Sequence, residues 1–325
     1  LHGLAAGGLG ELKNDWLANT TDPTPLFSLG VEYGYRLFGF WPLQVAYFVL
    51  LMAYFLSTWL LITGITNALP NRTQRFTFAA LFTTAHAAIF RWLSVQAWGV
   101  DYPWFLQSGL AGQYLLGPGI QPSAFGVLLI AALAAFVRNR FCLAVLLQSL
   151  ACLIHSTYLL PAALLTAGYL TAVWSEGRLR AAALVAIGSL VGVLPTIGYT
   201  LAYFSPTSAE VFAASQDVLA FTRIPHHARI ERWLDLIAWL QIVWMTLGIV
   251  LTYGTRLFTV LAVAAVGGVA SARRCRSASV PTRQRAPSSA PGPRRAATCT
   301  PSGRRSCKTS GAAGRWKRSE EHTSE

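Results

Sequence analysis

Long apolar stretches alternate with short polar turns from residue 43 to residue 270. A crossing of the membrane hydrocarbon layer takes about 20 apolar residues, within a range of roughly 17–25. The block 141–174 is too long for one crossing, so we interpret it as a hairpin that turns at 155–157. The predicted spans are 43–65, 77–97, 122–137, 141–154, 157–174, 181–203 and 233–252, with an eighth that begins near Leu257. This pattern predicts an all-α, polytopic transmembrane helix bundle with seven complete spans and a truncated eighth.

The charges of the connecting turns alternate along the chain and predict an orientation. One set of turns carries Arg72, Arg75, Arg138, Arg140, Arg178, Arg180 and Arg256, with Glu176 as the one acid. The other segments are 1–36, 98–121, 155–157 and 204–232, and they hold most of the acids. Short loops rich in Lys and Arg remain in the cytoplasm. We therefore expect the acidic segments, beginning with 1–36, to face the opposite side of the membrane.

Composition changes near residue 270. The whole chain has a formal net charge of +13. Residues 1–267 contain 13 Lys/Arg and 10 Asp/Glu, a net of +3, whereas residues 268–325 contain 13 Lys/Arg and 3 Asp/Glu, a net of +10. The second part has too little apolar surface to offset the entropy lost on ordering. We therefore predict a first extracytoplasmic loop at 1–36, a transmembrane bundle at 37–270 and a disordered basic tail at 271–325.

The basic tail has two interpretations. A genuine tail of this kind would be an arm that binds nucleic acid or anionic lipid. Its last eight residues, from Arg318 to Glu325, match the translation of a sequencing-adapter read, and the preceding run resembles GC-rich DNA read in the wrong frame. We favour the artefact, exclude the tail from fold reasoning and expect no nucleic-acid partner. Because the chain begins at Leu1 without Met and no span precedes 1–36, we also interpret it as a fragment of a larger polytopic protein.

Candidate residues for chemistry concentrate on the predicted outer face. They are Asp15, Asp22, Arg91, Asp101, His155, Arg223, His226, His227 and Arg229. Carboxylates act as general bases or metal ligands, and guanidinium groups bind phosphate oxyanions in a bidentate manner. Simpler roles stay open for the same residues. Arg91 can extend its charge to the membrane surface, His155 can cap a turn, and the loop around His226 can be an ordinary solvated loop.

Four stretches together carry a resemblance to a known family. They are Asn14–Pro23, Leu110–Pro118 with Gln121–Gly126, Ile154–Leu159 and Arg223–His227. Over residues 9–260 the chain resembles a family of bacterial polytopic inner-membrane proteins, which is similar in turn to GT-C type glycosyltransferases. The resemblance implies an enzyme of the inner membrane that uses a polyprenyl-phosphate-linked sugar at the periplasmic face.

The same resemblance implies roles for individual residues. Asp15 or Asp22 would be the catalytic carboxylate, and Arg91, Arg223 and Arg229 would bind the donor phosphate. The paired acidic motif of many GT-C enzymes is missing, because Asp15 follows Asn14 and Asp22 stands alone. The requirement for a divalent metal ion is therefore left open.

Two other classes of function remain alternatives to a transferase. A transporter or flippase for a lipid or small solute would place ionisable residues deep in its spans, where this chain has only His86. A non-catalytic assembly subunit would use the outer polar residues to dock a partner. Membrane lipid is an expected partner in all three cases.

Overall fold

Every regular element in the described part of the chain is a helix. This computed structural model describes residues 1–65, 69–86, 88–99, 115–117, 119–204, 207–223, 229–234 and 236–278. The all-α fold class predicted from the sequence is confirmed for these residues. Most of the predicted basic tail lies outside them, although the last helix, α14 (Arg256–Ala278), extends a short way into the range predicted as tail.

The segment 1–36, predicted as a loop, is largely helical. Its elements are α1 (His2–Ala6), the 3₁₀ turns η1 (Gly10–Asn14) and η2 (Leu17–Asn19), and α2 (Pro25–Phe38). Pro25 suits the first turn of α2, because its missing N–H would have no intrahelical partner there. Gly39, with φ of 64°, ends α2 in a conformation that favours glycine.

Three helices are long and apolar enough to cross a membrane. They are α3 (Trp41–Ile65), the helix from Ser156 to Ser175 that combines η5 (Ser156–Tyr158) with α8 (Leu159–Ser175), and α9 (Leu179–Tyr203). These helices match the predicted spans 43–65, 157–174 and 181–203 to within two residues at each end. α7 (Phe141–Ile154) ends just before His155, so the chain leaves the helix at the predicted turn.

Seven complete spans are not confirmed. The other apolar helices are shorter, at 10–17 residues: Pro122–Val137, which comprises η4 (Pro122–Gly126) and α6 (Val127–Val137), then α7, Ala238–Leu251 and Arg256–Ser271. Mean hydropathy alone does not reveal where a turn, a proline or a polar side chain ends a helix. The remaining elements are α10 (Ala209–Asp217), the π-helix η6 (Val218–Arg223), α12 (Ile230–Trp233) and α13 (Leu236–Leu251).

The predicted span 77–97 is not one continuous helix, because the first of its two helices ends at His86. α4 (Arg72–Ala85) ends there and α5 (Ala88–Trp98) begins two residues later. The His86 Nδ1 lies 2.8 Å from the Phe82 carbonyl oxygen, so Nδ1 carries the proton, and the Tyr54 hydroxyl donates to Nε2 at 3.1 Å. His86 is therefore tied to α3 through Tyr54, a tertiary contact that local hydropathy does not encode.

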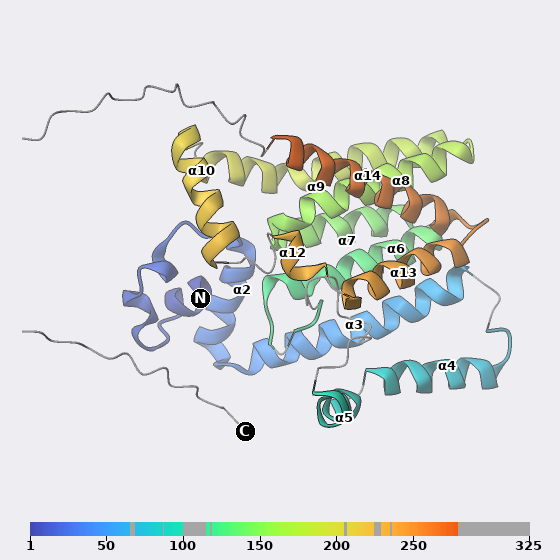
Figure 1. Ribbon diagram of the computed structural model, residues 1–325, viewed down its shortest axis with the longest axis horizontal. Helices are drawn as coiled ribbons and strands as arrows, with labels where there is room; N and C mark the ends of the chain where they lie inside the picture. The colour runs from blue at the N-terminus through green and yellow to red at the C-terminus, as the bar shows by residue number, and fades with distance from the viewer. Residues whose placement is uncertain are drawn as a thin grey trace, which may run out of the picture. The chain divides into compact units, whose positions relative to one another are not determined.

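Helices α6, α7, α8, α9 and α14 pack side by side and form the main core (Figure 1). In this core Phe136 stacks on Tyr169 with ring centroids 4.1 Å apart, and Val185 and Val260 are fully buried. The helices approach closely where glycines face a neighbour. A Cβ on Gly168 of α8 would lie 2.8 Å from the Val260 Cα and carbonyl oxygen of α14.

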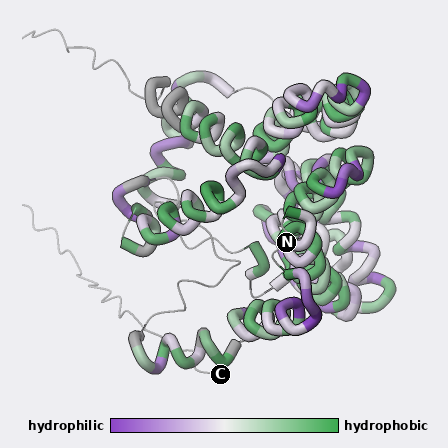
Figure 2. Tube along the Cα trace, turned by 90° about the vertical axis from the view of Figure 1, so that its right-hand side faces the viewer, coloured by the Kyte–Doolittle hydropathy of each residue, from purple (hydrophilic) through white to green (hydrophobic). Residues whose placement is uncertain are grey.

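The α7–α9 contact is equally close. Gly188 and Gly192 of α9, four residues apart, face Val145 and Ser149 of α7. One turn further along α9, the Thr196 hydroxyl donates to the Cys152 carbonyl at 3.2 Å. Small residues in a GxxxG spacing combined with interhelical hydrogen bonds are typical of helix packing in membranes. Figure 2 shows long hydrophobic runs along the helices, with hydrophilic residues mostly at the turns.

Candidate functional sites at the two ends of the helices

Asp22 is the best placed of the predicted carboxylates. Its Oδ1 accepts a hydrogen bond from the Thr24 N–H at 2.8 Å and lies 3.9 Å from the Nδ1 of His2. The latter distance is that of an ion pair rather than a hydrogen bond. The other carboxylate oxygen, Oδ2, has no bond to any described residue. The side chain is 19% exposed, so Asp22 offers one open oxygen in a half-buried position.

The end of α9 positions Asp22 and supplies an aromatic surface beside it. The Tyr199 hydroxyl donates to the Asp22 carbonyl oxygen at 2.7 Å. The Tyr199 ring stacks on Tyr203 with centroids 4.6 Å apart, and Phe204 lies edge-on at 6.2 Å. Tyr203 is 63% exposed, so this aromatic pair is partly open to its surroundings.

Asp15 has a local structural role. Its Oδ1 accepts from the Leu17 N–H at 2.8 Å, which is the side-chain-to-backbone bond of an Asx turn and the same bond that Asp22 makes with Thr24. Its carbonyl oxygen accepts from the Asn19 side-chain amide at 2.7 Å. No described contact connects Asp15 with Asp22 or His155, so the structure does not assemble the two predicted carboxylates into a pair.

His155 lies in the turn between α7 and η5, at the same end of α9 as Asp22. On α9, Thr196 bonds to Cys152 of α7, which lies about one turn before His155. Tyr199, about one turn after Thr196 on α9, bonds to Asp22. The His155 Nδ1 is buried and has no hydrogen-bond partner among the described residues. Burial lowers the pKa of this imidazole, because the charged form is poorly solvated. A neutral His155 is therefore favoured in the folded protein.

The predicted cations are only partly described. Arg229 is paired with Glu231 at 3.6 Å and lies over the Phe221 ring at 5.0 Å. Arg91 lies in α5, and Arg223 is the last residue of η6. For these two residues the backbone is described and the side chain is not. The remaining predicted ligands, Asp101, His226 and His227, lie outside the described residues. Their proposed convergence on a donor phosphate therefore stays a prediction.

No metal centre is found within the described part of the chain. In that part no three His, Cys, Asp or Glu side chains gather closely enough to hold a metal ion. Asp22 and His2 alone supply two ligand groups, fewer than the sites of divalent ions usually take from a protein.

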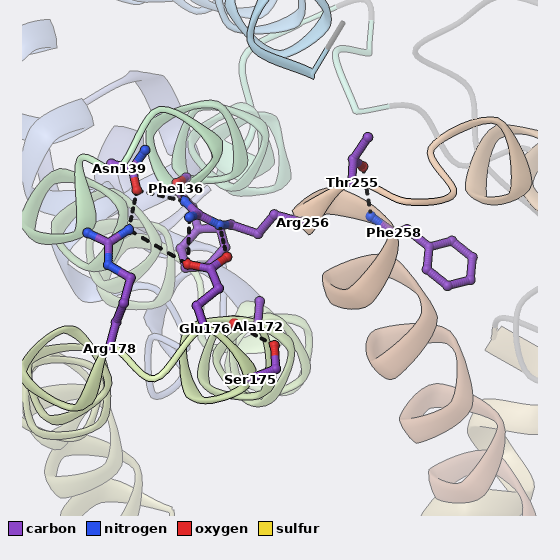
Figure 3. Close-up of polar contacts among 9 residues, drawn as sticks. All are labelled: Phe136, Asn139, Ala172, Ser175, Glu176, Arg178, Thr255, Arg256 and Phe258. Carbon is purple, nitrogen blue, oxygen red and sulfur yellow. Dashed lines mark hydrogen bonds and ion pairs between the residues drawn. The ribbon is translucent and has the colours of Figure 1, made fainter.

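The opposite end of the helices is closed by a charged network (Figure 3). The Nε and Nη2 of Arg256, at the start of α14, each donate to one oxygen of the Glu176 carboxylate at 2.6 Å. Arg256 also donates to the Asn139 side-chain oxygen at 2.8 Å, and Arg178 donates to the same oxygen. The network therefore joins the α6–α7, α8–α9 and α13–α14 turns.

Arg138 attaches α3 to this end as well. Its guanidinium donates to the Leu60 carbonyl at 3.0 Å and to the Thr63 hydroxyl at 2.7 Å, both near the end of α3. A shallow cavity of about 360 Å³ opens beside the network and is lined by Glu176, Tyr253, Thr255 and Arg256 among others. The turns that carry Arg138, Arg178 and Arg256, grouped on one side from the sequence, thus meet at one end of the bundle. For the turn with Arg72 and Arg75, the described contact is local, from Arg75 to the Leu69 carbonyl.

Several residues of both ends were not identified from the sequence. His2 and Tyr199 gave no local signal, because their importance depends on contacts with Asp22, which is 177 residues from Tyr199. The arginines were assigned only as orientation signals, although a lone acid, Glu176, among them was a hint of pairing. Comparisons with protein families, with curated proteins and with solved structures find no match.

Proposed function

We propose that this chain is a multi-spanning membrane protein whose Asp22 end carries out GT-C-like transfer from a polyprenyl-phosphate-linked sugar. The observation that carries the proposal is the Asp22 carboxylate, which is half-buried, held by one oxygen and open at the other. A general base needs a fixed carboxylate with a free lone pair within reach of the acceptor hydroxyl. Asp22 meets this requirement. Asp15 is bonded in the same way through its Oδ1, but only Asp22 is also held to the helix bundle, by the bond from Tyr199 of α9.

The membrane part of the proposal is supported by helix length, packing and exposure. Three helices have the length and hydropathy to cross a membrane, and the shorter apolar helices pack with them. Large apolar side chains remain exposed along α3 and α9, including Phe48 at 66% and Leu201 at 77%. Exposed apolar surface of this extent is stable in lipid and costly in water. We propose seven crossings, with the shorter helices completed by the residues that flank them.

The proposed orientation follows from the charged ends. Short loops rich in Lys and Arg remain in the cytoplasm. In this proposal the Arg256–Glu176 network is therefore cytoplasmic, and the Asp22 end is periplasmic in a bacterial inner membrane. That arrangement presents Asp22 at the membrane surface, where a polyprenyl-phosphate-linked sugar and an acceptor can both reach it.

A transfer at this site has a balanced mechanism. Asp22 removes a proton from the acceptor hydroxyl, whose oxygen forms a bond to the anomeric carbon of the sugar. The bond from that carbon to the donor phosphate oxygen breaks, and the phosphate leaves on the polyprenyl chain. The predicted cations Arg91, Arg223 and Arg229 would stabilise the charge that develops on the phosphate. The open face of Tyr203 supplies a flat surface on which a sugar ring can stack.

The test uses isolated membranes that contain the expressed protein. A radiolabelled polyprenyl-phosphate sugar is incubated with membranes, and transfer to glycan is compared between wild type, Asp22→Asn and Asp15→Asn. We expect Asp22→Asn to lower transfer by about 10²–10⁴-fold, as for loss of a general base, and Asp15→Asn to retain it. The asparagine at 22 keeps the bond to Thr24, so the loop should stay folded.

Equal activity of both variants, or the same loss in both, would refute a base role for Asp22. Binding of the labelled donor to purified wild type separates chemistry from recognition. If wild type neither binds nor transfers any labelled polyprenyl-phosphate sugar while it remains folded, the transferase proposal fails and transport or assembly becomes the better explanation.

A further inference from the structure

The centre of the α7–α8–α9 core contains a polar cluster that the proposed transfer does not use. Gln148 of α7 is 1% exposed. Its amide nitrogen donates to the Thr166 hydroxyl of α8 at 2.9 Å and to the Ser189 hydroxyl of α9 at 2.7 Å. One side chain thus connects three helices at a depth where the surrounding residues are apolar.

Two polar atoms of this region have no protein partner within the described residues. They are the Gln148 side-chain oxygen Oε1 and the Tyr169 hydroxyl of α8, whose side chain is fully buried. Exchanging the amide oxygen and nitrogen of Gln148 does not remove the difficulty, because one end of the amide would still face a site with no partner. Buried polar groups almost always have a hydrogen-bond partner, and where protein supplies none, an ordered water usually does.

The two atoms belong to the same part of the core. Thr166 and Tyr169 are three residues apart and are therefore neighbours on one face of α8. Long side chains on a helix lean toward its N-terminus, so the Tyr169 hydroxyl extends back toward the level of Thr166. The Gln148 amide lies at that level because it bonds to Thr166. The Tyr169 ring is held by stacking on Phe136, so its hydroxyl cannot turn out to solvent.

We propose that Gln148 and Tyr169 bind one internal water molecule between α7 and α8. The Tyr169 hydroxyl donates to the water oxygen, and the water donates to Gln148 Oε1. The site suits a small neutral molecule, since every side chain of the cluster is uncharged and the surrounding Ala144, Leu165 and Val173 are tightly buried. The bound water completes the polar connection between α7 and α8 in an otherwise apolar layer.

A double-mutant cycle in the full chain tests this site. Melting temperatures are measured in detergent for wild type, Tyr169→Phe, Gln148→Leu and the double variant. With the water present, Tyr169→Phe should lower the melting temperature by about 2–4 °C in the wild-type background and have little effect beside Gln148→Leu. Without it, Tyr169→Phe removes an unpartnered hydroxyl and should leave the melting temperature unchanged or higher in both backgrounds, which overturns the proposal.

Ser149→Ala is the matched control. Its hydroxyl is also buried without a partner but packs against Gly192 of α9, so it should not couple to Tyr169. Coupling of equal size in this control would overturn the proposal. If Gln148→Leu does not fold, a wild-type structure at a resolution that reveals water molecules shows whether the site is occupied. Density within hydrogen-bond distance of both atoms supports the site, and its absence there refutes it.

Discussion

The two ends of the helices are held together in different ways. At one end, Arg256, Glu176, Asn139 and Arg178 exchange charge-assisted bonds that join three turns. At the other, the N-terminal segment is attached by neutral contacts, such as the bond from Tyr199 to the Asp22 carbonyl and an edge-on contact of Phe27 with Phe125.

This difference separates stability from chemistry. A network whose charged groups are all bonded to a neighbour resists change and offers little reactivity. The Asp22 end keeps an open carboxylate oxygen and an unpartnered imidazole nitrogen on His155, which are the kinds of groups that catalysis requires. We therefore expect mutations at the charged end to affect mainly stability and mutations at the Asp22 end to affect mainly activity.

The largest loss of stability is expected from Gly168→Ala, beneath the charged end. Its new Cβ would meet the α14 backbone at Val260, which cannot move as a side chain can. Overpacking of this kind costs about 2–3 kcal/mol. The control is Gly198→Ala, because Gly198 of α9 has open space around it and alanine favours a helix. Denaturation of the detergent-solubilised protein measures both, and equal effects would contradict the close α8–α14 packing.

The second-largest loss of stability is expected from Arg256→Ala, which breaks the network itself. Glu176 and Asn139 lose their main donor, and we expect the free energy of unfolding to fall by about 2 kcal/mol. Arg180→Ala is the control, since Arg180 is exposed and has no bond to a described residue, so the change should be near zero. The same denaturation series compares them. If Arg256→Ala is as mild as its control, the network contributes nothing to stability.

A smaller effect is expected at the Asp22 end from Tyr199→Phe. Loss of one neutral hydrogen bond to the Asp22 carbonyl should cost about 1 kcal/mol, and it should loosen residues 1–38 specifically. Limited proteolysis followed by N-terminal sequencing measures cleavage in that segment. Tyr203→Phe, which keeps the Tyr199–Tyr203 ring stack, is the control. Unchanged cleavage in Tyr199→Phe would mean that this bond does not anchor the segment.

The smallest effect concerns pH. Burial lowers the pKa of His155 in the folded state, so the unfolded state binds a proton more readily. The stability that depends on neutral His155 is therefore present above the unfolded pKa of about 6.5 and is lost as the pH falls below it. Between pH 7 and 5 the wild type should lose more stability than His155→Gln does. Parallel pH profiles of the two proteins would contradict this role of burial.

Helices whose ends are fixed by local composition could be predicted from the sequence. α3 and α9 are long continuous apolar stretches, and the turn at His155 lies between two such stretches. The break at His86 could not be predicted, since it depends on a bond to Tyr54 in another helix. The helical character of α2 was also missed, because Pro25 indicates a loop and the start of a helix equally well.

The candidate site was predictable only in part, for the same reason. Asp22 was identified as one of the acids in an outer segment, but its preference over Asp15 depends on the bond that Tyr199 of α9 makes to the Asp22 carbonyl. The partners His2 and Tyr199 belong to distant positions in the chain. The polar cluster at Gln148 was overlooked, because uncharged polar residues scarcely change the hydropathy of an apolar helix.

The order of synthesis gives the Arg256 contacts a consequence for assembly. Arg256 is 80 residues from Glu176 and 117 from Asn139. At about 5–20 residues per second, a ribosome makes Arg256 some 4–16 s after Glu176. At the start of that interval α6 to α8 have been synthesised and α9 follows within it, while Glu176 lacks its arginine and Val260 has not yet reached Gly168. The nascent bundle is therefore open on its α14 side, and the α8–α14 contact is completed only after the rest of the core has been made.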